Sequence, residues 1–328
     1  MIPPSTRYEQ RSHRVGADPV LGRHREVERL VRPVERSQLP QAGAAPGYLL
    51  RYRLVAQALA IVAVLGSSFL LELTMLGNLR YDRDQAQLAA QFRIELARGI
   101  APVGPFDETN NALAVGAPVA LLEIPKLQLR EIVVEGTSSK TTMSGPGHRR
   151  DTPLPGQVGT SVVAGRRATF GKAFRSIDQL RAGDKITVTT GQGSNSFAVL
   201  GVRRAGDPVP PMLARGGGRL TLVTTDGPAL HPTDVLRVDA ELTSTAQPRP
   251  EQLPTQALLP AEALMAGESS ALLGVFSWSV LLTAAAIATV WFRFRVGLWP
   301  AWAFGVPVLI TLALFVVDEV AALLPNLL

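Results

Sequence analysis

Three apolar stretches limit what this chain of 328 residues can fold into. The first covers residues 54–77, and the other two cover residues 271–292 and 301–324. Each is close to the ~20 residues that an α-helix needs to cross the hydrocarbon core of a bilayer. We therefore expect one N-terminal and two C-terminal transmembrane helices, with a separate domain formed by the residues between the first and second stretches.

Arginines set the expected orientation, because cytoplasmic flanks carry an excess of positive charge. Arg51 and Arg53 stand directly before the first stretch, and Arg293 and Arg295 follow the second. The polar residues 1–53 precede the first stretch, unlike a signal peptide, so we expect a retained anchor. The expectation is a multi-pass protein of the cell membrane with a cytoplasmic N-terminus. Both the central domain and the C-terminus then lie outside the cytoplasm, and the loop 293–300 lies inside.

Charge and cysteine content exclude several kinds of function. The formal net charge is +6, but much of it lies in the Arg-rich tail, where it orients the protein and contacts anionic lipid headgroups. We therefore expect no nucleic-acid partner. The chain has no cysteine, which excludes disulfides, thiolate metal sites and a cysteine nucleophile. Its four histidines are too far apart for a metal site defined by spacing, so we expect no metal and no cofactor.

Two segments flank the first apolar stretch. Residues 1–53 mix Arg, Glu, Pro and Gly without a sustained period, which is typical of a disordered tail. The alternative is a helix in "REVERLVRPVER" that docks on an intracellular partner. Residues 78–117 are expected to form a helical stalk and linker, because Leu88, Phe92 and Leu96 recur at helical spacing. This stripe either packs on the next domain or pairs with a second copy.

The pattern changes to period two at residue 118. Short apolar runs separated by Gly, Pro, Ser and Asp are typical of an all-β domain, which we expect over residues 118–245. The candidate strands cover residues 119–124, 130–136, 159–165, 184–190, 196–202, 219–225 and 235–242. That number of short strands fits one compact barrel or sandwich, interrupted by a helical turn in "FGKAFRSIDQLRAGD". Residues 246–270 are rich in Pro, Ala and Gln and are expected to form a linker back to the membrane.

Several short motifs in this region together resemble a known family. "LEIPKLQL", "VVEGTS", "GPGH", "AGRRATFGKAF" and "RLTLVTT", in this order, are similar to the sortases, especially to the actinobacterial class E. The resemblance implies an eight-stranded β-barrel outside the membrane of a Gram-positive bacterium. It also implies work at the cell wall or cell surface: sortases cut a sorting signal such as LPXTG with a cysteine, hold the acyl-enzyme, and transfer the protein to an amine.

The resemblance also locates the three catalytic positions of the family. The family histidine stands in an "AGHR" motif, where this chain has "AGRR", so Arg166 occupies its position. The family cysteine closes a strand like "LTLVTT", which gives Thr225, and the family arginine, aligned on "AEL", corresponds to Val235. Arg237 lies two residues further on the same strand face and either supplies a cation or faces solvent.

These substitutions remove the nucleophile and the base together. A threonine hydroxyl needs an adjacent general base, and an arginine in place of the histidine stays protonated. We therefore expect a pseudoenzyme. The alternative is an active peptidase or transpeptidase with an unorthodox centre, in which Thr225 is assisted by His148, His231 or Asp226.

A vacated site can still bind. Arg166 and Arg237 would pair with the carboxylate of an acidic peptide or a peptide C-terminus, with Thr225 and His148 nearby in the groove. Equally, Arg166 would simply pair with a local acid such as Asp226. The expected partner is a sorting-signal-like peptide or a surface protein.

The C-terminal spans provide a second place for a partner. Small residues in "LLTAAAIATV" permit close helix packing, which favours a membrane partner or self-association, and a third function as a structural subunit of a membrane complex. Asp318 and Glu319 follow the last apolar run, and either lie at the headgroup level or mark a functional site inside the bilayer.

Overall fold

The computed structural model describes residues 52, 66–71, 75–107, 111–228 and 231–328. The chain divides into two units, residues 1–56 and residues 57–328, and of the first unit only Tyr52 is described. The expected cytoplasmic tail and most of the first expected span lie outside the described residues.

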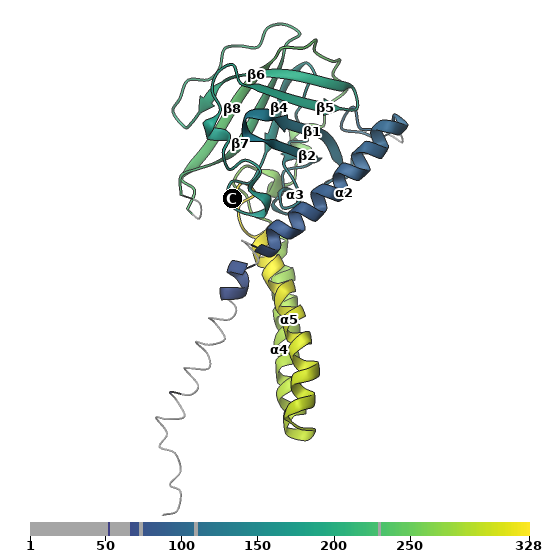
Figure 1. The fold of residues 1–328 in the computed structure, drawn as a ribbon, viewed down its shortest axis with the longest axis vertical. Coiled ribbons are helices and arrows are strands. Elements are labelled where there is room, and N and C mark those ends of the chain that lie inside the picture. The colour runs from purple at the N-terminus through teal and green to yellow at the C-terminus, as the bar shows by residue number, and fades with distance from the viewer. Residues whose placement is uncertain (1–51, 53–65, 72–74, 108–110, 229–230) are drawn as a thin grey trace, which may run out of the picture. The chain divides into compact units, whose positions relative to one another are not determined.

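Eight strands close into a barrel in the order β1-β2-β3-β4-β7-β8-β6-β5 (Figure 1). The strands are β1 (Pro118–Ile124), β2 (Leu129–Glu135), β3 (Gly147–His148), β4 (Gly159–Ala164), β5 (Lys185–Thr190), β6 (Gly193–Arg203), β7 (Gly218–Asp226) and β8 (Asp234–Leu242). This confirms the barrel implied by the sequence motifs. The period-two pattern missed only β3, because two residues are too few to show a period, yet β3 closes the barrel between β2 and β4.

Side chains that alternate along β7 and β8 fill the barrel. Leu236, Val238 and Ala240 of β8 are fully buried in the main core, together with Leu220 and Leu222 of β7. Neighbouring positions point to the other face of the sheet. Almost every residue of β7 is buried, so its outer face is covered as well. The cover over this outer face defines the site described below.

Short helical segments connect the strands. Between β4 and β5 the expected helical turn consists of two 3₁₀ turns, η3 (Phe170–Lys172) and η4 (Ile177–Gln179). Between β2 and β3 lies one short helix, α3 (Ser139–Thr142), whose first turn is capped by the hydroxyl of Ser138. Both connections carry residues of the site.

The helix α2 (Gly77–Arg98) precedes the barrel and ends at Gly99, which adopts a left-handed conformation with φ 71°. Its apolar stripe packs on the barrel: Phe92 is buried against Ile132 of β2, with Leu88 and Leu96 beside it. The predicted stripe is therefore confirmed, and it docks on the chain's own barrel.

A titratable carboxyl lies under α2. The hydroxyl of Tyr81 donates to Glu131 Oε2 over 2.9 Å, and burial raises the pKa of Glu131 to about 7. The folded state therefore holds a proton on Glu131 that the unfolded chain releases near pH 4.5. This protonation stabilises the fold below that pH, and the contribution is lost as the pH rises through 7.

We expect the free energy of unfolding to fall by on the order of 2 kcal/mol between pH 4.5 and 8 through this group. Thermal unfolding of the detergent-solubilised chain at several pH values measures it. Glu131→Gln should remove this part of the pH dependence. Glu123→Gln is the matched control, because the Glu123 carboxylate lies on the barrel surface beside Arg130. An unchanged pH profile in Glu131→Gln would contradict the assignment.

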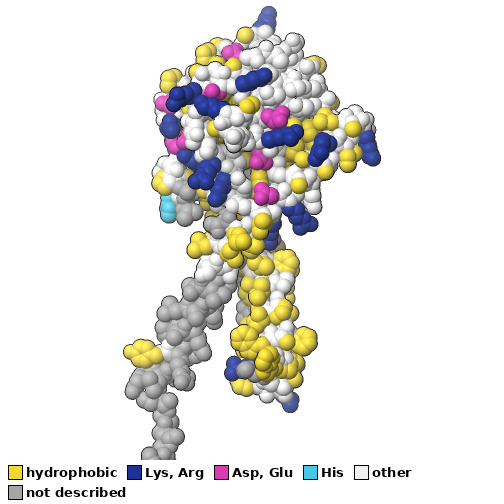
Figure 2. Space-filling model, viewed as in Figure 1, with side chains coloured by type: hydrophobic (Ala, Val, Ile, Leu, Met, Phe, Trp, Pro, Cys, Tyr) yellow, Lys and Arg dark blue, Asp and Glu magenta, His cyan; other side chains and the backbone are white. Residues whose placement is uncertain are grey.

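The two C-terminal helices are α4 (Ala271–Arg295) and α5 (Leu298–Ala322). Both are long and apolar enough to cross a membrane, and they coincide with the second and third predicted spans. They pack side by side, with Trp278 stacked on Phe315 at 4.6 Å, and they present apolar side chains on their outer surfaces (Figure 2). The N-terminal span is not among the described helices of this kind.

The end of α5 is joined to the barrel unit by ion pairs. Asp318 lies 2.6 Å from Arg80 of α2, and Glu319 lies 3.1 Å from Lys140 of α3. Both carboxylates are thus paired with cations of the domain that follows the first expected span. Both therefore lie near the end of the apolar helix α5, and their position at the headgroup level stays a prediction.

Candidate functional site

The site lies where β7 ends and β8 begins. Thr225 is the last residue but one of β7 and stands opposite Val235 in the register of β8. Its side chain is only 4% exposed, and its hydroxyl donates to the carbonyl oxygen of Leu327 over 3.4 Å. Val235 packs against an apolar cluster that includes Leu327. The structure therefore brings together Thr225 and Val235, two of the three positions that the family resemblance implied, and a third segment covers them.

Arg166 follows β4 and is one of the largest fully buried side chains described. Its Nε donates to Thr142 Oγ1 over 3.2 Å, and one terminal nitrogen donates to Thr169 Oγ1 over 3.0 Å. The other terminal nitrogen donates to both the carbonyl and the hydroxyl oxygen of Ser139, and the guanidinium lies 5.1 Å from the ring centre of Phe170. Every one of these partners is neutral.

The Arg166 guanidinium is buried without a counter-ion, and this determines whether it can act as a base. Among the described residues, no carboxylate lies within ion-pair distance of Arg166, and removal from water lowers its pKa to about 9. The side chain is still protonated at neutral pH. It therefore cannot accept a proton from the hydroxyl of Thr225.

Asp226 is adjacent to Thr225 but pairs with other arginines. Its carboxylate accepts hydrogen bonds from Arg167 over 3.2 Å and from Arg204 over 2.9 Å. Burial raises the pKa of Asp226, but the Gly227 N–H and these two arginines outweigh that effect and hold it below its usual value. Asp226 is thus a stabilised anion, bonded to Arg167 and not to Arg166.

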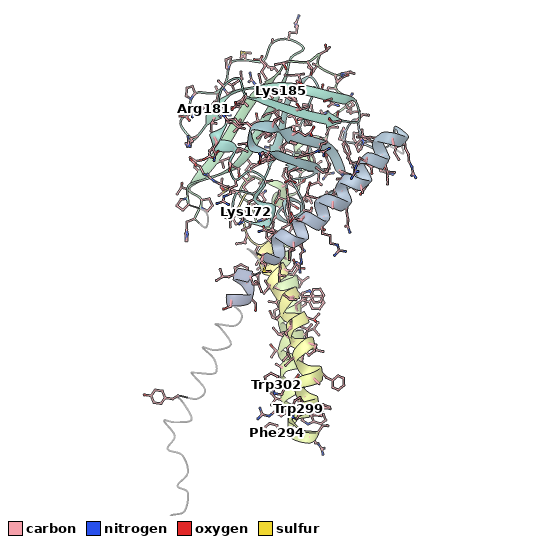
Figure 3. The ribbon with its side chains drawn as sticks, in the orientation of Figure 1. Lys172, Arg181, Lys185, Phe294, Trp299 and Trp302 are labelled. Atoms are coloured by element: carbon pink, nitrogen blue, oxygen red, sulfur yellow. The ribbon has the colours of Figure 1, made fainter. Side chains whose placement is uncertain are left out.

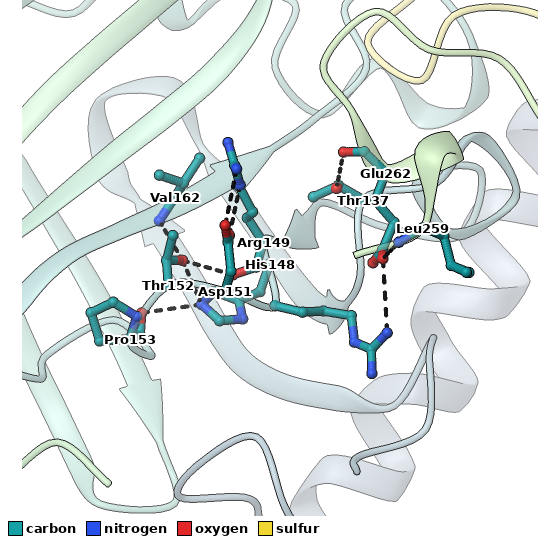
Figure 4. A network of polar contacts seen from close by, with 10 residues as sticks. Thr137, His148, Arg149, Asp151, Thr152, Pro153, Val162, Leu259 and Glu262 are labelled. Atoms are coloured by element: carbon teal, nitrogen blue, oxygen red, sulfur yellow. Dashed lines mark hydrogen bonds and ion pairs between the residues drawn. The ribbon is translucent and has the colours of Figure 1, made fainter. Parts of the chain in front are cut away.

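His148 forms a separate buried cluster on β3 (Figure 4). Its Nδ1 lies 2.9 Å from a carboxylate oxygen of Glu135, and its Nε2 lies 3.1 Å from the carbonyl oxygen of Pro153. Thr152 is also within 3.2 Å of Nε2. Both ring nitrogens face oxygen acceptors, so neither is free to take a proton from a nucleophile. His231, in contrast, is exposed in the loop between β7 and β8.

Arg237 stands opposite Val223 of β7 and Arg203 of β6. It shares the outer face of β8 with Val235 and is half-buried. Within the described part of the chain Arg237 makes no ion pair, whereas Arg203 pairs with Asp239 at 3.0 Å. Arg237 therefore supplies a positive charge next to the site without a local anion to neutralise it.

The segment Leu324–Leu328 covers the site, which the sequence motifs did not predict. Leu327 is fully buried against Ala164 and Val223, with the partly buried Val235, Leu264 and Met265 around it. The carbonyl oxygens of Leu327 and Leu328 accept hydrogen bonds from the backbone of residues 167–169. Figure 1 shows this end of the chain beside α3. The only signal in the sequence was an apolar run, "LLPNLL", which gives no indication of its docking place.

A basic cleft lies next to the covered site. Its volume is about 340 Å³, and its lining includes Arg167, Lys172 and Arg175. Figure 3 labels Lys172 at the edge of the barrel near the C-terminal helices. In the described residues no group of acidic, histidine or cysteine side chains has the arrangement of a metal site.

Comparison with known proteins finds a family model that matches part of the chain. Residues 122–242 match the family model for the sortase domain. Sortase SrtE1 of Streptomyces coelicolor is 31% identical over 167 residues, which are 46% of this chain and 46% of that protein. Sortase D of Bacillus subtilis is 31% identical over 85 residues, which are 26% of this chain and 41% of that protein. The chain thus matches less than half the length of these curated relatives.

Solved sortase structures are among the structures similar to this chain. Sortase E from Streptomyces avermitilis is 28% identical, with a TM-score of 0.33, and the match covers 46% of this chain and all of that one. A Clostridium perfringens sortase D5 transpeptidase is 21% identical, with a TM-score of 0.41, covering 49% of this chain and 99% of that one.

Proposed function

Starting from a chain that carries a sortase domain over residues 122–242, we propose that it is a membrane-anchored pseudo-sortase. In this proposal the domain recognises a segment of a surface protein or another envelope protein and neither cleaves nor joins it. The observation that carries the proposal is the state of Arg166, a buried cation bonded to neutral partners at the position where the family resemblance requires a base.

The surroundings of Thr225 support the absence of transfer chemistry. A threonine nucleophile needs a base within hydrogen-bond reach that can take its proton. The Thr225 hydroxyl donates to a backbone carbonyl, Arg166 is protonated, and Asp226 is held by two arginines. His148 has both nitrogens engaged in its own cluster. The alternative of an active Thr/His centre therefore has no base at hand among the described side chains.

Membrane anchoring is the second part of the proposal. The aromatic residues Phe294, Trp299 and Trp302 are exposed where α4 connects to α5 (Figure 3), with Arg293 and Arg295 beside them. Aromatic rings and arginines at one end of an apolar hairpin are typical of the cytoplasmic membrane interface. The barrel is then held on the outer side, which supports a partner in the cell envelope.

Charge favours a partner segment with acidic residues. Arg237 lies on the outer face of β8 next to the site, and the basic cleft adds Lys172 and Arg175, whereas Arg167 in the same lining is paired with Asp226. Guanidinium groups pair well with carboxylates. In this proposal Arg166 shapes the site from the barrel side, whereas Arg175, which is exposed, and the half-buried Lys172 and Arg237 meet the ligand.

Binding of a fluorescent LPXTG-type peptide with acidic flanks to the solubilised full chain tests the proposal. We expect saturable binding that weakens with salt, and a ~3–5-fold loss of affinity in Arg175→Glu, as for other rim charges. Arg181→Glu is the matched control, because Arg181 is exposed on a different part of the barrel from Lys172 (Figure 3). Equal binding in both variants, or no saturable binding, would contradict recognition and favour a purely structural subunit.

A further inference from the structure

We propose that Leu324–Leu328 is an intramolecular ligand that holds the sortase-like site closed, so that an external segment binds only by displacing it. The inference goes beyond the proposed function, because it identifies the resident occupant of the site inside the chain itself. It rests on contacts with three walls of the site: the loop after β4, the end of β7, and α3.

The loop after β4 binds the backbone of the segment. Arg167 N–H donates to the Leu327 carbonyl oxygen over 3.1 Å, and the N–H groups of Ala168 and Thr169 donate to the Leu328 oxygen over 2.8 and 3.0 Å. Consecutive N–H groups that converge on carbonyl oxygens bind a chain through its backbone. An unrelated segment with another sequence could use the same donors, as in other sites that recognise extended peptides.

The Leu327 side chain supplies the apolar part of the contact. It is fully buried among Ala164, Val223 and Val235, and also against Leu264 and Met265 from the connection that leads to α4. Thr225, one of the three positions that the family resemblance implies, therefore contacts Leu327 directly, and Val235, a second one, packs against the cluster to which Leu327 belongs. A valine and a threonine methyl group suit an aliphatic side chain, which a charged arginine and a thiolate would not.

Asn326 fixes the register of the segment. Its Nδ2 donates to the carbonyl oxygens of Thr137 over 2.6 Å and of Ala263 over 2.9 Å, and its backbone N–H donates to Ala266. The side chain is fully buried. A slip of the segment by one residue would leave these carbonyl oxygens without partners in a buried place, which is costly.

Arg166 stabilises the residues that bind the segment Leu324–Leu328. Ser139 accepts from Arg166 and donates its hydroxyl hydrogen to the Leu324 carbonyl oxygen over 2.8 Å. Thr169 accepts from Arg166 through its hydroxyl and donates its N–H to the Leu328 oxygen. Arg166 thus contacts both groups that hold the two ends of the segment. In this proposal an arginine stands at the position that the resemblance assigns to the family histidine because it stabilises the docked segment Leu324–Leu328.

The Cys-free chain allows a direct test. In Thr225→Cys the single thiol lies beneath the segment, and we expect it to react with a maleimide at least ~10-fold more slowly than the thiol of Thr243→Cys, at an exposed position. Adding Leu327→Asp, which forces a carboxylate into the apolar pocket, should speed up labelling at position 225 by ~10-fold or more. Arg166→Ala should do the same.

Thr224→Cys is the matched control for unfolding. Thr224 is as buried as Thr225, but its hydroxyl bonds to Gly165 and none of the contacts of the segment involves it. We expect its labelling to stay slow when Leu327→Asp is added. If the maleimide labels Thr225→Cys equally fast with and without the added Leu327→Asp substitution, the proposal is overturned.

A second measurement decides the case in which Leu327→Asp also exposes position 224. In the chain with Ala164→Cys and Leu327→Cys, a short thiol crosslinker should join the two positions, since both side chains belong to the same small buried cluster. The pair Ala164→Cys and Leu273→Cys, on the exposed face of α4, should stay unjoined. Failure of the first pair to crosslink would overturn the proposal. Neither readout uses a peptide or turnover, so this failure is distinct from failure of the proposed function.

Discussion

Incubation of the full chain with an LPXTG peptide and an amine nucleophile is expected to leave the peptide intact. The rate should lie at least ~10⁴-fold below that of a sortase with its Cys and His, since loss of both nucleophile and base typically costs ~10⁴–10⁶ in turnover. The physical reason is that the described part of the chain offers Thr225 no free base, because Arg166 is protonated and Asp226 is paired with two arginines. Chromatographic separation of peptide and products measures the rate.

Two control variants distinguish a site that lacks catalytic groups from a catalytic site that Leu324–Leu328 blocks. Thr225→Ala should leave the residual rate unchanged, because no step depends on its hydroxyl. Leu327→Asp, which opens the site, should also give no turnover, because opening does not supply a base. Cleavage that appears in Leu327→Asp and disappears on addition of Thr225→Ala would reject the pseudo-sortase proposal and support a regulated hydrolase.

Opening of the site is expected to raise the apparent affinity for a peptide by ~10–100-fold. A tethered segment competes at a high effective concentration, and the apparent affinity of an external ligand falls in proportion to the fraction of open site. An occupant docked in ~90–99% of molecules gives this range. Titration of the labelled peptide into the full chain and into Leu327→Asp measures the ratio.

A variant of the membrane hairpin provides the control for this titration. Leu273→Asp places the same charge on the exposed face of α4 and should leave the affinity unchanged when the chain is held in detergent. Equal affinity in the full chain and in Leu327→Asp would show that the segment does not compete for the peptide site. Tighter binding in Leu273→Asp would indicate a nonspecific effect of the added charge.

Much of the fold could be predicted from the sequence because its signals are local. Alternation along 235–242 identified the inward face of β8, and helical spacing identified the docked stripe of Leu88, Phe92 and Leu96. Apolar length identified α4 and α5. The strand β3 was missed by the pattern, because two residues pair with β2 and β4 through contacts that no local period records.

The site was less predictable because its decisive contacts join distant parts of the chain. The motif "AGRR" indicates a cation at position 166, but only the fold shows that Ser139, Thr142 and Thr169 satisfy it. Thr225 and Leu327 are separated by 102 residues, and no pattern in "LLPNLL" indicates that they meet. The sequence alone shows that the chain has no thiol. That Leu324–Leu328 covers the site could be found only from the structure.

Mass spectrometry of the intact protein after incubation with the sorting peptide tests the central claim most directly. A transpeptidase forms a covalent acyl-enzyme, and Thr225 is the residue that the family resemblance implies at the nucleophile position. The pseudo-sortase account predicts an unmodified mass for both the full chain and the opened Leu327→Asp variant. A peptide-derived mass increase that maps to Thr225 would contradict it.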